Sequence, residues 1–426
     1  MQLRDFLRSG HTPTLFCAFL YFDISFMVWV LIGALATSIA PEFGLSDSQK
    51  GLMVAVPILG GAALRLALGL MADHVGPRRT AVVGMALTLV PLLLGWLWAT
   101  NFTRLLVTGL LLGVAGASFA VALPLASRWY PPRHQGLAMG IAGAGNSGTA
   151  LATFFGPRLA EQIGWHAVFG LAAVAVVATF VVFALLAKNS PNQPAPKPLA
   201  EYWEVLGERD TSWFSLFYSV TFGGFVGLAS FLSIFFRDQY ELSRVAAGTF
   251  ATLCVVAGSF LRPVGGYLAD RFGGIRVLTA LYVAIGCVML GVSTLPSLGI
   301  ATVALFVGMG CLGMGNGAVF QLVPQRFSRE IGVVTGIVGA AGGVGGFLLP
   351  NLLGSLKQLT GSFGGGFVVF AFASLACAGG LLYVSQAWQR AFVGRGGMAP
   401  ALVPVVIESE PQFADAAAEP GRSRIA

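Results

Sequence analysis

The sequence has little charge. Only 10% of its 426 residues are Asp, Glu, Lys or Arg, whereas 56% are hydrophobic. A soluble domain usually carries about 25% charged residues, so this composition excludes a soluble globular fold. The apolar residues do not alternate with polar ones, and that excludes the pattern of a membrane β-barrel. The composition therefore predicts a helical integral membrane protein.

Cysteine and histidine are scarce as well. The five cysteines stand singly within apolar runs, and no CxxC pair occurs. Neither a disulfide framework nor a zinc site is therefore predicted. The four histidines lie in loops or at the ends of apolar runs, without a nucleophile or a second ligand nearby. We expect no metal, no cofactor and no enzyme activity.

Long apolar runs are what the sequence has instead. About 20 apolar residues suffice for a helix to cross the hydrocarbon core. The predicted fold class is an all-α membrane protein with twelve transmembrane helices in two pseudo-symmetric six-helix bundles. The expected spans are 13–38, 51–72, 80–99, 103–126, 136–157, 165–187, 212–236, 246–269, 277–296, 299–322, 331–355 and 366–387.

A linker divides these spans into six and six. We expect an N-terminal bundle over 1–188 and a C-terminal bundle over 211–390. Residues 189–210 are rich in proline and then in charge, which predicts a cytoplasmic linker ending in a short amphipathic helix. Residues 391–426 are rich in Ala, Pro and Gly, and we expect a disordered cytoplasmic tail.

The net charge of +7 follows the topology rather than a polyanionic partner. Basic residues gather in alternate loops, which predicts an inner-membrane protein with both termini cytoplasmic. The first apolar run is longer than a signal-peptide core, so we expect it to be retained. The lipid bilayer is the expected environment, nucleic acid is not an expected partner, and a monomer is expected.

One stretch occurs twice. LRLALGLMADHVGPRR begins at Leu64 and LRPVGGYLADRFGGIR begins at Leu261, and both place an arginine inside an apolar run. Arg262 stands 197 positions after Arg65. An arginine in a membrane span costs about 2.5–3.5 kcal/mol on insertion scales. Two of them at equivalent positions predict a paired anion site between the halves. The loop residues Asp73 and Asp270, and Arg79 and Arg276, match at the same offset.

The two arginines should lie at similar depth. Each stands eight residues before its loop aspartate, or about 12 Å along a helix. A guanidinium is planar and forked, which suits a planar oxyanion better than an ammonium does. Buried arginines can instead neutralise structural carboxylates. Asp23 is the one obvious acid within the apolar runs, so it cannot satisfy both.

The repeated stretches resemble a known loop motif. GLMADHVGPRR and GYLADRFGGIR are similar to the cytoplasmic loop motif of the major facilitator superfamily. GLAMGIAGAGNSGTA (136–150) and GVVTGIVGAAGGVGGFLLP (332–350) resemble the paired glycine-rich signatures of its nitrate/nitrite porter family. GMGNGAVFQLVPQRF (313–327) and LFYSVTFGGFVGLASF (216–231) are also similar to that family. The resemblance covers the chain to residue 387.

The resemblance implies roles for individual residues. It implies that the arginine pair binds nitrate, that Asn146 makes a polar contact with the anion, and that aromatic side chains line the site. Asn316 is open to two interpretations, a ligand or a hydrogen bond between helices. The glycine runs serve in gating, in helix packing, or in both. The implied aromatics are Phe119, Tyr218 and Phe222, and the implied gating glycines are Gly143, Gly145, Gly148, Gly339, Gly342 and Gly343.

Asp23 decides between modes of transport. One interpretation is a locally hydrogen-bonded acid at a helix interface. The other is a proton-coupling carboxylate, kept ionised by Arg65 or Arg262 until bound nitrate offsets their charge. We expect proton-coupled uptake of nitrate, with nitrite as a second substrate. Nitrate/nitrite antiport is the close alternative, and a non-transporting membrane nitrate sensor or a porter for another small anion, such as a carboxylate, are the others.

Overall fold

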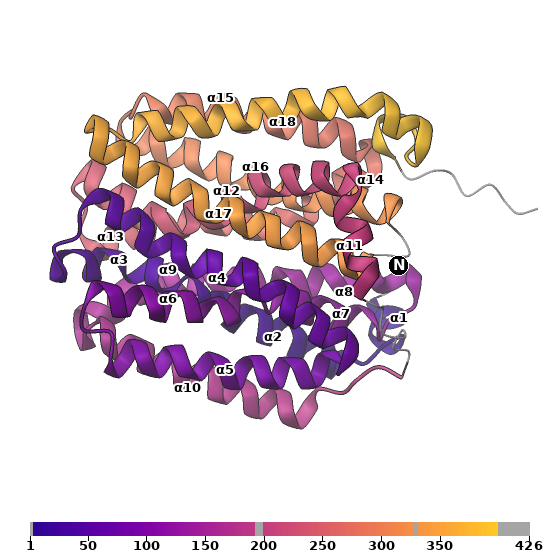
Figure 1. The fold of residues 1–426 in the computed structure, drawn as a ribbon, viewed down its shortest axis with the longest axis horizontal. Helices are drawn as coiled ribbons and strands as arrows, with labels where there is room; N and C mark the ends of the chain where they lie inside the picture. Colours follow the sequence, from indigo (N-terminus) through magenta and orange to yellow (C-terminus); the bar gives the residue numbers. More distant parts are fainter. Residues whose placement is uncertain (1–2, 192–198, 328–330, 399–426) are drawn as a thin grey trace, which may run out of the picture.

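The structure is a computed structural model and describes residues 3–191, 199–327 and 331–398. Within these ranges the chain is helical, and no strand occurs. Helices are favoured because a segment in lipid must satisfy its own backbone hydrogen bonds. The molecule forms two helical halves that lie side by side in Figure 1.

The first half runs from α1 to α10. Several helices begin with a clear signal: Ser46 and Gln49 form a capping box, and Asn101 caps α6. The helices are α1 (Leu3–Arg8), α2 (Thr12–Trp29), α3 (Leu31–Glu42), α4 (Asp47–His74), α5 (Pro77–Leu97), α6 (Phe102–Gly116), α7 (Phe119–Ser127), α8 (Pro132–Gly143), η1 (Ala144–Ser147), α9 (Gly148–Ile163) and α10 (Trp165–Leu186).

The second half runs from α12 to α18 and is preceded by the short helix α11. Gly273 separates α14 from α15 with a φ of 96°, as Gly76 separates α4 from α5 with a φ of 95°. The helices are α11 (Leu199–Gly207), α12 (Arg209–Tyr240), α13 (Arg244–Phe260), α14 (Arg262–Phe272), α15 (Gly274–Ser293), α16 (Leu298–Arg326), α17 (Ile331–Thr360), α18 (Gly364–Ala391) and η2 (Arg395–Gly397).

Eleven spans among the described residues are long and apolar enough to cross a membrane. The expected fifth span, 136–157, is not one continuous helix, because η1 separates α8 from α9. Three other spans also contain a break, at Val30, at Ala117–Ser118 and at Leu261. The expected path of the chain is confirmed, but four of its spans are assembled from shorter helices.

Polar side chains join the halves at one end of the molecule. We call it the far end, since α1, α11 and η2 lie at the opposite, linker end (Figure 1). There Lys50 Nζ of the first half lies 2.6 Å from Asp238 Oδ2 of the second. The hydroxyls of Thr153 and Thr252 are 2.8 Å apart. The far end is therefore closed by contacts between the halves.

The linker end is more open on one side. Helix α4 packs along α17 over much of its length. Helix α8 packs on α2 and α7, and α14 packs on α15 and α16, but α8 and α14 do not pack extensively on each other. Among the described residues, the close packing between the halves at this end therefore lies between α4 and α17 rather than between α8 and α14.

The second half extends beyond the predicted boundary at residue 390. Helix α18 ends at Ala391, and the chain then forms η2. Gly396 lies against the side chain of Arg276, and Gly397 lies against the backbone of Ile275. The expectation of disorder from residue 391 is therefore wrong for 391–398, because these residues pack on the α14–α15 loop. Residues 399–426 lie outside the described residues.

Candidate functional site

The two repeated arginines meet at one aromatic ring. Arg65 lies in α4, and Arg262 is the first residue of α14. The Cζ atom of each lies 5.4 Å from the centroid of the Phe119 ring. Arg65 is fully buried, whereas Arg262 is partly exposed. The sequence prediction that one guanidinium from each half faces a common site agrees with this geometry.

Arg65 is held by backbone carbonyls. Its Nη2 donates to the carbonyl of Gly116 at 2.9 Å, and its Nη1 donates to the carbonyl of Gly339 in the other half. Gly116 ends α6, and the C-terminus of a helix attracts a cation. Neither arginine forms a salt bridge with any described carboxylate. The two positive charges repel each other and stay uncompensated.

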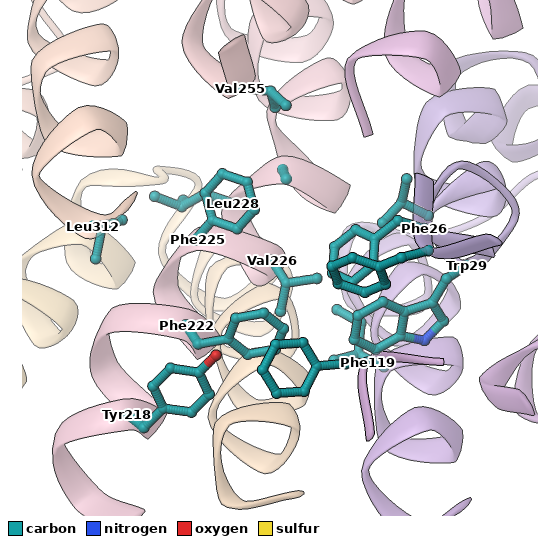
Figure 2. Packing of buried hydrophobic residues seen from close by; sticks show 14 of the residues in the cluster. Phe26, Trp29, Phe119, Tyr218, Phe222, Phe225, Val226, Leu228, Val255 and Leu312 are labelled. Carbon is teal, nitrogen blue, oxygen red and sulfur yellow. The ribbon is translucent and has the colours of Figure 1, made fainter. Parts of the chain in front are cut away.

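Aromatic rings enclose these charges. Tyr218 stacks on Phe222 at 5.0 Å and meets Phe320 edge-on at 5.0 Å. Phe320 in turn lies 6.0 Å from Phe119, and the Arg65 guanidinium lies 5.7 Å from the ring of Trp29. Figure 2 shows Trp29, Phe119, Tyr218 and Phe222 gathered from both halves. The rings keep water from the Arg65 guanidinium and strengthen its electrostatic effect.

Several polar atoms in this region have no partner. They include Arg65 Nε, one terminal nitrogen of Arg262 and both amide atoms of Asn146. The backbone carbonyl of Asn146 accepts from Ser259 Oγ at 3.3 Å, and Ser259 lies one turn before Arg262. Buried polar groups usually have partners, so unpaired donors around two arginines indicate a place for an anion.

The helix breaks lie at the site. Phe119 and Arg262 each begin a helix after a break, Trp29 ends one, and Asn146 lies in η1. Broken helices at membrane depth free backbone groups for substrate, which is typical of transporters. The Gly116 carbonyl that Arg65 uses comes from such a break.

Five of the six predicted gating glycines lie at close contacts. A Cβ at Gly339 would lie 3.0 Å from Arg65 Cδ, and one at Gly342 would lie 2.6 Å from Tyr218 Cδ1. A Cβ at Gly343 would meet Ala62 at 2.7 Å. Gly145 and Gly148 lie against the backbone of Asp23. Gly143 has nothing within 4 Å of a Cβ, so close packing does not require a glycine there.

Asp23 is not paired with the arginines. Its Oδ1 accepts from Ser147 Oγ at 2.6 Å, and its carboxylate faces the backbone N–H of Gly148, where α9 begins. It forms no salt bridge within the part of the chain that the structure describes. We expected Arg65 or Arg262 to act directly on the Asp23 carboxylate. The carboxylate instead contacts Ser147 in η1, the residue after Asn146.

The loop motif differs between the halves. Asp73 Oδ1 lies 2.8 Å from Arg128 Nη2, whereas Asp270 is exposed. Arg79 is exposed, and its neighbour Arg78 instead donates from Nε to the carbonyl of Ala187 at 2.7 Å. Arg276 is exposed too and lies against Gly396. The motif residues lie at the ends of α4 and α14 and at the starts of α5 and α15, and their structural or gating role stays a prediction.

Sequence reasoning missed Trp29, Phe320 and Ser147. Trp29 donates from its indole to the carbonyl of Pro57 at 2.7 Å and presents its ring to Arg65. Phe320 stands in one of the stretches that carry the family resemblance, four residues after Asn316. That i, i+4 spacing places both on one helix face and could have indicated the residue.

Comparison with known proteins agrees with this geometry. The family model of the Major Facilitator Superfamily matches residues 17–350. The chain is 34% identical to the nitrite extrusion protein of Bacillus subtilis over 85% of its own length and 91% of the relative's. It is 34% identical to the probable nitrate transporter NarT of Staphylococcus carnosus, covering 79% and 87% of the two chains. It is 32% identical to the probable nitrate/nitrite antiporter NarK1 of Thermus thermophilus, covering 83% and 87%.

Solved structures share the fold. A bacterial homologue of the human lysosomal transporter Spinster, in an inward-facing and occupied conformation, superposes with a TM-score of 0.67 at 18% identity, covering 88% of this chain and 97% of that one. The human organic anion transporter MFSD10 superposes with a TM-score of 0.68 at 15% identity, covering 87% and 99%. The chain therefore belongs to the major facilitator superfamily and, within it, to the family of nitrate and nitrite transporters.

Proposed function

We propose that this protein carries nitrate, and also nitrite, across the membrane by alternating access. The observation that supports this most directly is the arginine pair. One guanidinium from each half faces the ring of Phe119, and no described carboxylate neutralises either. A small oxyanion between the two would be attracted by both charges, would compensate one of them and would join the halves.

The energies are of a suitable size. At an effective dielectric constant of about 20, a unit charge contact at 4 Å is worth roughly 4 kcal/mol. Two such contacts offset much of the cost of removing water from a weakly hydrated monoanion. Nitrate and nitrite accept hydrogen bonds only, and the arginines donate only. The donors of Arg65, Arg262 and Asn146 therefore suit these anions.

The glycine contacts supply the movement. α17 lies against Arg65, Tyr218 and Ala62 through glycines, which allow close approach and sliding of membrane helices. The far end is closed and α8 stands apart from α14, as in a carrier open toward its linker end. Closing that side and opening the far end would transfer the anion.

We propose that nitrate uptake is coupled to protons through Asp23. Its partner Ser147 directly follows Asn146, so an anion bound by Asn146 would shift η1 and alter the contact with the carboxylate. Asp23 would then take up a proton, and the proton and anion would move together.

Flux measurements test the function and the coupling separately. Purified protein in proteoliposomes should accumulate ¹⁵N-labelled nitrate, and an inwardly directed proton gradient should stimulate uptake without internal nitrite. In Asp23→Asn the gradient should lose its effect while exchange remains. Equal stimulation of mutant and wild type would remove Asp23 from the coupling.

Exchange of nitrate for nitrite is the second candidate. It is favoured because Asp23 forms no salt bridge with either arginine among the described residues. The empty site then carries two positive charges that no carboxylate offsets, and such a site would resist reorienting without a bound anion. A relative from Thermus thermophilus is named a probable antiporter. Uptake that requires internal nitrite and ignores the proton gradient would select exchange.

We further propose an inner-membrane location, cytoplasmic termini and a monomer. Arg78 donates to the carbonyl of Ala187, shortly before the linker, and Arg128 pairs with Asp73; these basic residues support a cytoplasmic position for the linker end. Protease accessibility of the two termini in oriented vesicles tests the topology.

A further inference from the structure

A second asparagine lies beside the start of the helix that carries Arg262. Asn316 stands in the middle of α16 and is 1% exposed. Both its amide oxygen and its amide nitrogen have no hydrogen-bond partner. An unpaired buried amide is costly, and membrane helices normally pair such a group with a neighbouring helix. The amide is thus available to a ligand.

Neighbouring contacts fix the position of Asn316. Gly315 lies against Thr221 of α12, where a Cβ would approach Thr221 Cγ2 to 2.6 Å. Gly317 lies against the carbonyl of Arg262 in α14. Asn316 is therefore held between the helix that carries Tyr218 and Phe222 and the helix that begins with Arg262.

The face of α16 that carries Asn316 also lines the site. Phe320 follows by four residues and contacts both Phe119 and Tyr218. The internal repeat also places Asn316 at the site, since Asn316 stands 197 positions after Phe119, as Arg262 does after Arg65. The ring on which both guanidiniums lie thus has an amide as its counterpart in the second half.

We propose that Asn316 is a specificity-determining residue that donates from Nδ2 to the oxygen that nitrate has and nitrite lacks. This rests on the proposed transport of these anions. Nitrate is trigonal with three oxygens in one plane, whereas nitrite is bent and has two. Arg65 and Arg262 contribute one guanidinium each, and a further amide N–H adds a donor that a third oxygen can use. Losing it weakens nitrate binding more than nitrite binding.

The test compares Asn316→Ala with Asn351→Ala. Asn351 is also in the second half, but its Nδ2 already donates to the carbonyl of Phe347 at 2.8 Å. Affinities for nitrate and nitrite are measured by competition against ¹⁵N-nitrate uptake in proteoliposomes. We expect Asn316→Ala to lower the affinity for nitrate about tenfold, which is the effect of one hydrogen bond to a charged group. The affinity for nitrite should fall by less than about threefold. Asn351→Ala should keep the wild-type ratio.

The melting temperature of the ligand-free protein excludes a packing role. Asn316→Ala removes an unsatisfied amide, so the empty protein should melt no lower than wild type, and stabilisation by nitrate should shrink. A lower melting temperature, failure to fold, or equal weakening of both anions would overturn the proposal, as would no change. Wild-type protein that neither transports nor is stabilised by nitrate would refute the proposed function instead.

Discussion

At the scale of the residue, shape is as important as charge. Arg65 uses two nitrogens on carbonyls from different helices and keeps its Nε free. An ammonium has one nitrogen and cannot reach both carbonyls and an anion in the same geometry. Two nitrogens of the Arg65 guanidinium are thus held by carbonyls, and its Nε can still donate to the substrate.

Arg65→Lys and Arg262→Lys should each reduce nitrate uptake to below about 10% of wild type, because the charge remains while the fork is lost. Initial rates of uptake in proteoliposomes measure this. Arg390→Lys is the control, since Arg390 is exposed at the end of α18. Uptake near the wild-type rate in either variant would contradict two-pronged binding.

The sequence revealed some site residues and concealed others. Arg65 and Arg262 were predictable because a charge in an apolar run is costly and both recur at one offset. Trp29 and Phe320 were not, because the chain has 33 phenylalanines and 8 tryptophans, and nothing marks those that face the site. The local partner of Asp23 was hidden too, since it depends on η1 approaching α2.

At the scale of the element, α17 touches the site through a row of small residues. Gly339 faces Arg65, and Gly342 faces Tyr218, with no room for a side chain. A methyl group at these positions would push α17 away from α4 and α12. In the proposed alternating access, this helix moves while the contacts remain close.

Gly339→Ala should reduce nitrate uptake at least tenfold, because its Cβ would lie 3.0 Å from Arg65 Cδ, and even a small displacement of a binding group is costly to function. Uptake is compared with protein level in the membrane. Gly379→Ala in α18 is the matched control, since nothing lies within 4 Å of a Cβ there. Similar activity of the two variants would show that the contact at Gly339 is not needed.

The fold class and eleven of the twelve expected spans could be predicted, but the interruptions of the spans could not. Apolar runs and loop signals locate the crossings. The breaks at Val30, Ala117–Ser118 and Ala144–Ser147 contain no proline and lie within apolar sequence. They arise from packing between helices, such as Gly148 against Asp23, which a single sequence does not display.

At the scale of the whole molecule, the far end is held by a small set of polar contacts. Lys50 bridges Asp47 at 3.0 Å and Asp238 at 2.6 Å. The backbone N–H of Ser48 donates to Gln358 Oε1 at 3.0 Å, again between the halves. Alternating access requires that these contacts break when the far end opens.

Lys50→Gln should favour the state open at the far end, because it leaves Asp47 and Asp238 without their shared cation. Thr37, beside Lys50 in a cavity of about 180 Å³, can be replaced by cysteine in a background without native cysteines. Its labelling by an impermeant maleimide should rise roughly fivefold, the equivalent of about 1 kcal/mol.

The control for this measurement is Lys357→Gln. Lys357 lies at the same end but donates within its own half, to the carbonyl of Gly361. It should leave the labelling rate of Thr37→Cys unchanged. Equal rates in the two lysine variants would mean that the Lys50 contacts do not hold the far end closed.

The lack of extensive packing between α8 and α14 sets the order in which an anion would meet the two arginines. An anion entering from the linker end meets the partly exposed Arg262 first, whereas Arg65 lies fully buried behind the rings. In the proposed transport, Arg262 would therefore bind an arriving anion before Arg65 does, and an anion leaving on the same side would lose the contact with Arg262 last. Although the two halves repeat the same sequence pattern, their arginines would thus contact the anion at different moments of transport.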